Sequence, residues 1–250
     1  MMNVSIYRKR RGMGRTRDTV RKVLEMINNP TLKEPVARKV SASTRENAQA
    51  FGKCATAAKM LKNALGPLMD QVHDPSCHQR LIKELMKVIR EDTTGIKSDG
   101  LQNGDLTLLS RFKFNFKADL LSRLFCYCTS TINRKDGHMT ISIPSFDSCL
   151  ELVVPRGATH YQFLSAGVGV DFAKNTFDSE IQRTEPLPVG VHNTRPVAFI
   201  HHVGVGDSNT LFLVVALKFY VKCGEALLPV MDKSFNPVNV VQVSNAIRSI

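Results

Sequence analysis

Cys126 and Cys128 are separated by a single residue, a spacing that can chelate a metal ion. On a strand this spacing places both thiols on one face, about 7 Å apart along the chain. A structural zinc site needs four ligands, and no second pair at a matching spacing occurs. His73 and Cys77 could share a helical face, but Pro75 lies between them and interrupts a helix. We therefore predict no metal site, and interpret the two neighbouring cysteines as small buried hydrophobic side chains.

Histidine is the commonest general base, and three histidines lie on predicted strands. His201 and His202 are adjacent, so they point to opposite faces and at most one can face a given pocket. His160 has a similar setting, and no nucleophile elbow or triad signature accompanies any of the three. Gly204–Asp207 lacks the third glycine of a dinucleotide-binding loop and is interpreted as a turn. No calcium-loop spacing occurs among the carboxylates Asp147, Glu151, Asp171, Asp178, Glu180 and Glu185.

Because none of these residue patterns matches a known metal-binding or catalytic motif, we predict that the protein is not an enzyme and has no catalytic residue and no cofactor. The strongest functional signal is instead a basic arm, residues 8–22, in which eight of fifteen residues are basic and one is acidic. The basic residues are Arg8, Lys9, Arg10, Arg11, Arg15, Arg17, Arg21 and Lys22. Guanidinium groups match phosphate geometry, so the arm could follow a nucleic-acid backbone or an anionic lipid surface. It could equally contact an acidic face of a neighbouring subunit, or be a solvated segment without a specific partner.

The positive charge is concentrated in the first third of the chain. Residues 1–95 carry 19 basic and 9 acidic side chains, whereas residues 96–250 carry 15 and 13. The start of the chain lacks the apolar segment of a signal peptide, and the longest strongly apolar run, Leu211–Leu217, is too short to cross a bilayer. Six cysteines in a chain of this length do not indicate a disulfide scaffold. We therefore predict a cytoplasmic protein with reduced thiols and no membrane span.

Apolar spacing predicts helices in the first part of the chain. Residues 1–40 combine the basic arm with a possible short helix over 18–27. Residues 41–95 are expected to form a helical pair. The first of these helices is expected to begin at a capping box, Ser43–Glu46, and the second at Ser76. Gly66 followed by Pro67 is expected to end or kink the first.

From about residue 105 the apolar period changes to two, which is typical of strands. Phe112, Phe114 and Phe116 are expected on one face of a strand, and Gly137 at the left-handed position of a hairpin turn. Further strands are predicted at residues 124–132, 139–143, 150–154, 160–165, 168–172, 197–203, 211–221 and 238–243. Strands this dense, without intervening helices, predict a mostly antiparallel β-sandwich over residues 105–243 and an α+β fold overall.

Several stretches of the chain form a recognisable set: Thr44–Asn47 with Phe51–Gly52, Phe112–Phe116, Ile141–Phe146, Pro155–His160 with Ser165–Gly167 and Asp171–Phe172, and Leu211–Leu217 with Phe219–Tyr220. In these stretches the chain resembles a family of uncharacterised proteins that recurs in Bacteroidetes genomes. The stretches span about residues 43–243, and the resemblance implies kinship without an activity. Members of that family begin with a lysine- and glycine-rich segment, whereas this chain has the arginine-rich arm.

The expected function is therefore that of a non-enzymatic structural or assembly protein that forms homo-oligomers. The basic arm would then reach a neighbouring subunit or a polyanion. The alternative is a nucleic-acid-binding protein that uses the same arm without sequence preference, because phosphate contacts carry no base information. A nucleic-acid-binding protein would release the nucleic acid as the salt concentration rises, whereas a homo-oligomer would keep the same mass.

Overall fold

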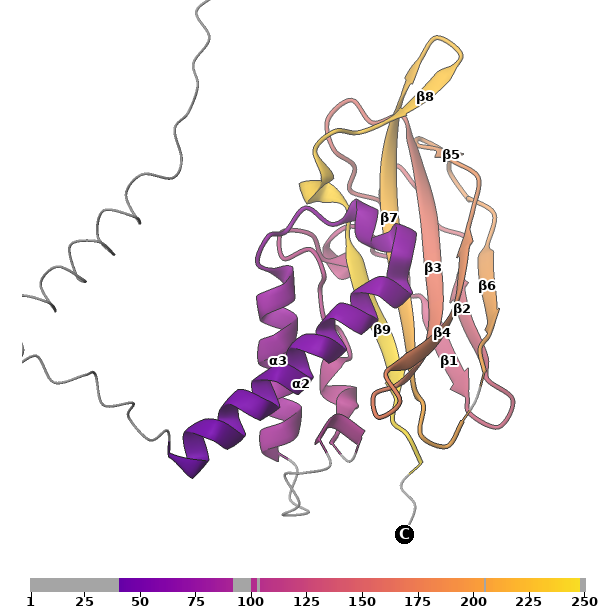
Figure 1. Cartoon of the computed structure of the whole chain (residues 1–250). Helices are drawn as coiled ribbons and strands as arrows, with labels where there is room; N and C mark the ends of the chain where they lie inside the picture. The colour runs from indigo at the N-terminus through magenta and orange to yellow at the C-terminus, as the bar shows by residue number, and fades with distance from the viewer. Residues whose placement is uncertain (1–40, 92–99, 103, 205, 248–250) are drawn as a thin grey trace, which may run out of the picture. The chain divides into compact units, whose positions relative to one another are not determined.

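The computed structural model describes residues 41–91, 100–102, 104–204 and 206–247 (Figure 1). The basic arm and the predicted helix over 18–27 lie outside the described residues. From Arg45 onward the described chain forms one compact unit. No helix among its described residues combines the length and the apolar character needed to cross a bilayer.

The helical part consists of α2 (Ala42–Leu65), a 3-10 turn (Gly66–Gln71) and α3 (Cys77–Glu91). The expected capping box at Ser43 is wrong, because the backbone N–H of Thr44 donates to Ser41 Oγ at 3.1 Å. Both serines offer the same hydroxyl acceptor, and capping at Ser41 adds two residues to the helix. Gly66 ends α2 as predicted, with a left-handed φ of 41°.

The described residues form nine strands in two antiparallel sheets. The strands are β1 (Thr129–Asn133), β2 (His138–Ile143), β3 (His160–Asp171), β4 (Thr176–Arg183), β5 (Leu187–Pro188), β6 (Val197–His202), β7 (Thr210–Cys223), β8 (Ala226–Pro229) and β9 (Val238–Ser244). The larger sheet has the order β4-β3-β7-β8, with β5 beside β3 and β9 beside β7. The smaller sheet has the order β1-β2-β6.

The larger sheet is the middle layer of the unit, with α2 and α3 on one face and the smaller sheet on the other (Figure 1). Side chains of β3 alternate between the two faces. Leu164, Ala166 and Val168 pack with the helices, whereas Tyr161 and Phe163 pack toward β2 and β6. Both faces are covered, so almost all of β3 and the first part of β7 are buried. The predicted α+β class with mostly antiparallel strands is confirmed.

The hairpin prediction is confirmed, and Gly137 has a φ of 71° between β1 and β2. The predicted break between 165 and 168 is wrong, because β3 continues through Gly167. The strand predicted over 150–154 is reduced to one bridge, between Leu124 and Leu152. The strand predicted over 124–132 begins only at Thr129.

The phenylalanine-rich stretch forms no strand of its own. Phe112 and Phe114 are buried, but Phe116 is exposed, because the chain turns where Ala118 N–H donates to the carbonyl of Asn115. Before the turn, residues 111–114 exchange backbone hydrogen bonds with β9 and cover its outer edge. The alternating phenylalanines therefore predicted burial correctly for Phe112 and Phe114 and wrongly for Phe116.

The two sheets are joined laterally where β4 lies beside β6, and we call this the β4–β6 side. Three side chains of β4 hydrogen-bond to the outer backbone edge of β6 and the residues after it. The contacts are Gln182 Nε2 to the Ile200 carbonyl at 2.6 Å, His202 N–H to Glu180 Oε2 at 2.7 Å, and Gly204 N–H to Asp178 Oδ2 at 2.6 Å. Backbone groups that no strand pairs are thus satisfied by side chains.

Candidate interaction surface

The opposite lateral side, where β1 approaches β9, contains a cavity of about 460 Å³, and we call it the β1–β9 side. Its apolar lining comes from both sheets: Ile141 and Ile143 of β2, Val215 of β7, and Val240 and Val241 of β9. Polar groups also line it, among them Arg111, Lys113, Asp119 and Asn239. An apolar cavity with a few polar groups is the usual form of a binding site.

Four large apolar side chains lie exposed on and beside this side, and we call them the apolar surface. They are Leu121, Phe125, Tyr127 and Leu150, with 67, 59, 84 and 77% of their area exposed. Leu121 and Tyr127 line the cavity directly. A soluble surface normally shows such residues singly, so a group next to a cavity indicates an interaction site.

Backbone pairing with residues 151–153 holds the apolar surface outward. Phe125 N–H donates to the Glu151 carbonyl at 2.9 Å, and Val153 N–H donates to the Arg123 carbonyl at 2.8 Å. Because neighbouring extended residues face opposite ways, Leu124 points into the core and Phe125 points out. The exposure of the Phe125 ring therefore follows from a fixed backbone.

Asp119 anchors the start of the segment, residues 119–128, that carries Leu121, Phe125 and Tyr127. Its carboxylate forms an ion pair with Lys113 Nζ at 2.5 Å and accepts a hydrogen bond from Asn239 Nδ2 at 2.8 Å. Desolvation raises the pKa of Asp119, but the contacts with Lys113 and Asn239 outweigh it and hold that pKa below its usual value. The carboxylate is therefore ionised at neutral pH and fixes the segment against β9.

Strand β1 offers a free edge on the same side. It pairs with β2 on one edge, and no strand within the described ranges pairs with the other. Its sequence, Thr-Ser-Thr-Ile-Asn, carries no charge and no proline. Charged residues and proline are the usual protection of an edge strand against pairing with another chain. This edge has neither.

Cys126 and Cys128 lie side by side as predicted, with their Sγ atoms 3.9 Å apart, but in an irregular segment before β1. Both line the cavity and are half-buried rather than core residues. The hydrogen bond between the thiols, together with burial, raises the pKa of Cys126, and the same bond lowers that of Cys128. Their interpretation as small buried hydrophobic side chains is therefore only partly correct.

The three histidines singled out from the sequence have three different surroundings. His201 is fully buried between the sheets, where its Nε2 lies 2.7 Å from the hydroxyl of Ser165, also fully buried. Burial lowers the pKa of His201, so the ring is neutral and serves packing. His202 stacks at a tilt against His138, with ring centroids 4.9 Å apart, and His160 Nδ1 contacts the Thr159 hydroxyl.

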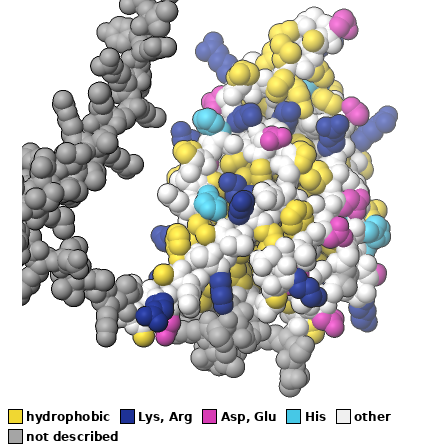
Figure 2. All heavy atoms as spheres, viewed as in Figure 1, with side chains coloured by type: hydrophobic (Ala, Val, Ile, Leu, Met, Phe, Trp, Pro, Cys, Tyr) yellow, Lys and Arg dark blue, Asp and Glu magenta, His cyan; other side chains and the backbone are white. Residues whose placement is uncertain are grey.

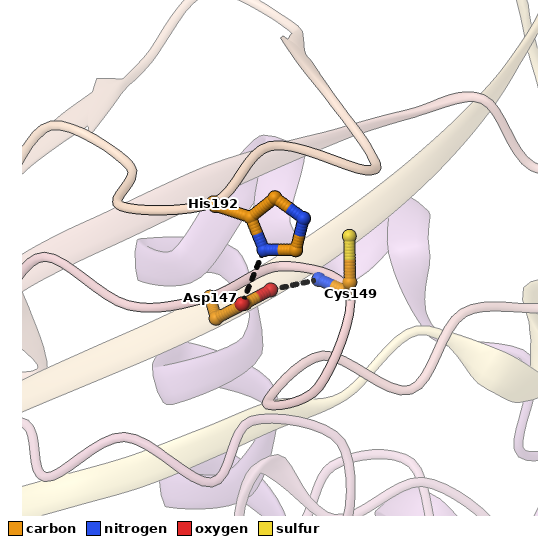
Figure 3. A group of neighbouring side chains, drawn as sticks. All are labelled: Asp147, Cys149 and His192. Atoms are coloured by element: carbon orange, nitrogen blue, oxygen red, sulfur yellow. Dashed lines mark hydrogen bonds and ion pairs between the residues drawn. The ribbon is translucent and has the colours of Figure 1, made fainter.

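The structure also brings together three residues that the sequence did not connect: Asp147, Cys149 and His192 (Figure 3). Asp147 was noted only among the carboxylates, and Cys149 and His192 lie 43 positions apart. A short loop after β2 and another before β6 carry them. The one local signal was Asp147 two residues before Cys149, which is common in ordinary turns.

Acidic and basic side chains are interspersed on the face drawn in Figure 2, without a large area of one sign. This agrees with the near-balanced composition after residue 95. The strongly basic segment is thus confined to residues outside the described part. Comparisons with protein-family models, with curated proteins and with solved structures found no match. The resemblance to a Bacteroidetes family stays a prediction.

Proposed function

We propose that this chain is a non-enzymatic assembly protein that forms homo-oligomers through its β1–β9 side. The observation that carries the proposal is the apolar surface of four exposed side chains beside a cavity of about 460 Å³. In this proposal the two sheets form a β-sandwich-like body over residues 105–243. The basic arm contacts a neighbouring subunit or a polyanion, and the protein works in the cytoplasm with its thiols reduced.

A second copy of the chain fits this side because projecting side chains and a cavity occur together on it. A two-fold axis brings the same patch of two subunits face to face, so each projecting side chain meets the other subunit's cavity. Tyr127 is the most exposed member of the apolar surface and lines the cavity of its own subunit. In this proposal the Tyr127 ring of one subunit contacts the cavity of the second subunit, and the same contact is repeated in the opposite direction.

The free edge of β1 supports the same partner. Two identical strands related by a two-fold axis run antiparallel, which is the arrangement that extends an antiparallel sheet. The edge carries no charge, so two copies can approach without like charges opposing each other. Apolar contact and backbone pairing would then act on one interface.

The basic arm gives the second candidate function, binding of nucleic acid without sequence preference. Eight basic residues with one acidic residue among fifteen would neutralise several phosphates. Binding of this kind weakens steeply as salt rises, because the released counterions drive it. Apolar association does not share that dependence.

Light-scattering mass on a sizing column, with absorbance at 260 and 280 nm, separates the two functions. We expect the purified chain to elute as a multimer free of nucleic acid in both low and high salt. A monomer in both conditions would overturn the assembly proposal. A high 260/280 ratio that falls to clean monomer in high salt would favour nucleic-acid binding instead.

A matched pair of leucine variants tests the interface itself. Leu121→Asp places a charge on the apolar surface, and we expect it to shift the multimer to monomer. Leu228→Asp makes the same change on an exposed leucine of the β7–β8 hairpin, away from the cavity lining, and should keep the multimer. Equal behaviour of the two variants would contradict the proposed interface.

A further inference from the structure

Asp147, Cys149 and His192 present three different metal-binding side chains at one point of the surface (Figure 3). One ligand atom from each lies within 4.8 Å of the others. Asp147 Oδ2 and His192 Nδ1 are 2.5 Å apart, and Asp147 Oδ1 accepts a hydrogen bond from Cys149 N–H at 2.7 Å. We propose that this group binds a divalent transition-metal ion of borderline softness, for which Zn²⁺ is the type. The proposal is independent of the assembly function.

The donor set matches that class of ion. Zinc takes thiolate, imidazole and carboxylate ligands at about 2.0–2.3 Å, whereas calcium and magnesium take oxygen ligands alone. Donors around a tetrahedral ion lie about 3–4 Å from one another, so the present separations need only small side-chain rotations. Cys149 and His192 are both exposed and free to make them. Three protein donors leave a fourth position open to water.

Buried contacts of Ser148 prearrange the two loops. The Ser148 hydroxyl accepts from Gly190 N–H at 3.1 Å and Val191 N–H at 2.8 Å, and donates to the Val191 carbonyl at 3.0 Å. Thr194 adds a second tie, because its hydroxyl accepts from Phe146 N–H at 3.0 Å. Ser148 and Thr194 are both buried, so the loops carrying Cys149 and His192 are held in register by groups that need not move.

Glu151 orients the loop that carries the carboxylate. Its Oε2 accepts from the backbone N–H of Asp147 at 2.7 Å, which fixes the start of the turn. Outer contacts of this kind set the direction of metal ligands in known sites. The site thus has both donors and supports, although it lies at the surface.

Binding of the ion would displace protons from the site. The ion would take the place of the proton shared between Asp147 Oδ2 and His192 Nδ1, and the Cys149 thiol proton would leave to solvent as the sulfur–metal bond forms.

The same three residue types could instead form a Cys–His–Asp nucleophile. Activation would require a thiol with a lowered pKa that hydrogen-bonds the imidazole. In the structure Cys149 is linked to Asp147, whose Oδ1 accepts from the Cys149 backbone N–H at 2.7 Å, and His192 Nδ1 is directed at Asp147 Oδ2 at 2.5 Å. The geometry therefore favours metal binding over nucleophilic chemistry.

Titration of the reduced, metal-free full chain with Co²⁺ tests the proposal, because a cobalt–thiolate bond gives a near-ultraviolet charge-transfer band. We expect one equivalent of Co²⁺ to produce the band and Zn²⁺ to displace it. Cys149→Ser should abolish the band, and His192→Gln should weaken Co²⁺ binding by about tenfold or more. Circular dichroism of each variant checks that the fold is retained.

Two controls identify the thiol. Cys223→Ser removes another exposed cysteine and should leave the band unchanged. The double variant Cys126→Ser, Cys128→Ser removes the thiol pair at the cavity and should also leave it unchanged. A band that survives Cys149→Ser, or one that is lost only in the double variant, would overturn the assignment. Absence of any band in the parent chain would overturn it as well.

Discussion

On the β4–β6 side, side chains of β4 reach across and hydrogen-bond the backbone of β6, whereas the β1–β9 side contains a cavity lined by residues of both sheets. The first arrangement needs charged and amide side chains placed at alternate positions of β4. The second leaves the edge of β1 without a strand partner among the described residues. The two sides therefore differ in how their edges are covered. Side chains of β4 bond the edge of β6, whereas Arg134, just after β1, bonds the Ser244 carbonyl of β9 and the edge of β1 has no strand partner among the described residues.

The charge of the edge strands also differs between the two sides. Strand β4 carries Asp178, Glu180 and Arg183, and such charges discourage pairing with another chain. Strand β1 carries none, and the exposed side chains next to it are apolar. The closed β4–β6 side therefore serves folding, and the open β1–β9 side is the one that we propose for a partner.

The largest expected effect lies between the sheets, near the closed side. A Cβ at Gly167 would lie 2.6 Å from His201 Cβ, and the hydrogen bond to Ser165 prevents His201 from moving aside. We expect Gly167→Ala to lower the free energy of unfolding by about 2 kcal/mol, the usual cost of overpacking a core. Thermal unfolding followed by circular dichroism measures it.

Gly52→Ala is the matched control. A Cβ at Gly52 meets nothing within 4 Å, and Gly52 lies inside α2. Alanine is the better helix former, so this variant should gain about 0.5–1 kcal/mol. A Gly167→Ala protein as stable as the parent would mean that the sheets are not packed tightly at His201.

An intermediate effect is expected at Glu180. Desolvation opposes its ionisation, but hydrogen bonds from His202 N–H and the Gln182 amide outweigh this and lower its pKa below 4.5. Because the folded-state pKa is the lower one, this stabilisation is complete above pH 4.5 and is lost as pH falls toward the folded-state value. We expect Glu180→Gln to cost about 1 kcal/mol at pH 7.

Urea unfolding of both proteins between pH 7 and pH 3 checks this expectation. The difference in stability between parent and variant should shrink as pH falls below 4.5. Glu225→Gln, in the turn between β7 and β8, provides the same change of charge away from β6. A difference that grows on acidification would show that Glu180 does not close the β4–β6 side.

The smallest effect on stability is expected on the open side. Tyr127 is 84% exposed, so Tyr127→Ala should change the free energy of unfolding of the subunit by no more than about 0.5 kcal/mol. Measuring the urea midpoint at low protein concentration separates the subunit's stability from assembly. A large loss there would mean that the tyrosine supports the fold, and that the open side is not reserved for a partner.

Local patterns predicted several elements well. The helices, the hairpin at Gly137 and strands β7 and β9 follow from apolar spacing and turn residues within short windows. Strand β4 was missed because an exposed edge strand rich in charge carries no apolar alternation. The prediction separated residues 160–165 from 168–172, whereas β3 runs through Gly167, which makes room for His201 from another strand.

The sequence by itself determined the charge distribution, the helical first part, the antiparallel strands and the pair of thiols at Cys126 and Cys128. Only the tertiary structure decided that Phe116 and Phe125 are exposed, that a cavity lies where β1 approaches β9, and that Cys149 lies beside His192. The reason is physical. Helix and strand periods arise from neighbours a few residues apart, whereas a side chain's burial and partners depend on segments that fold onto it from far along the chain.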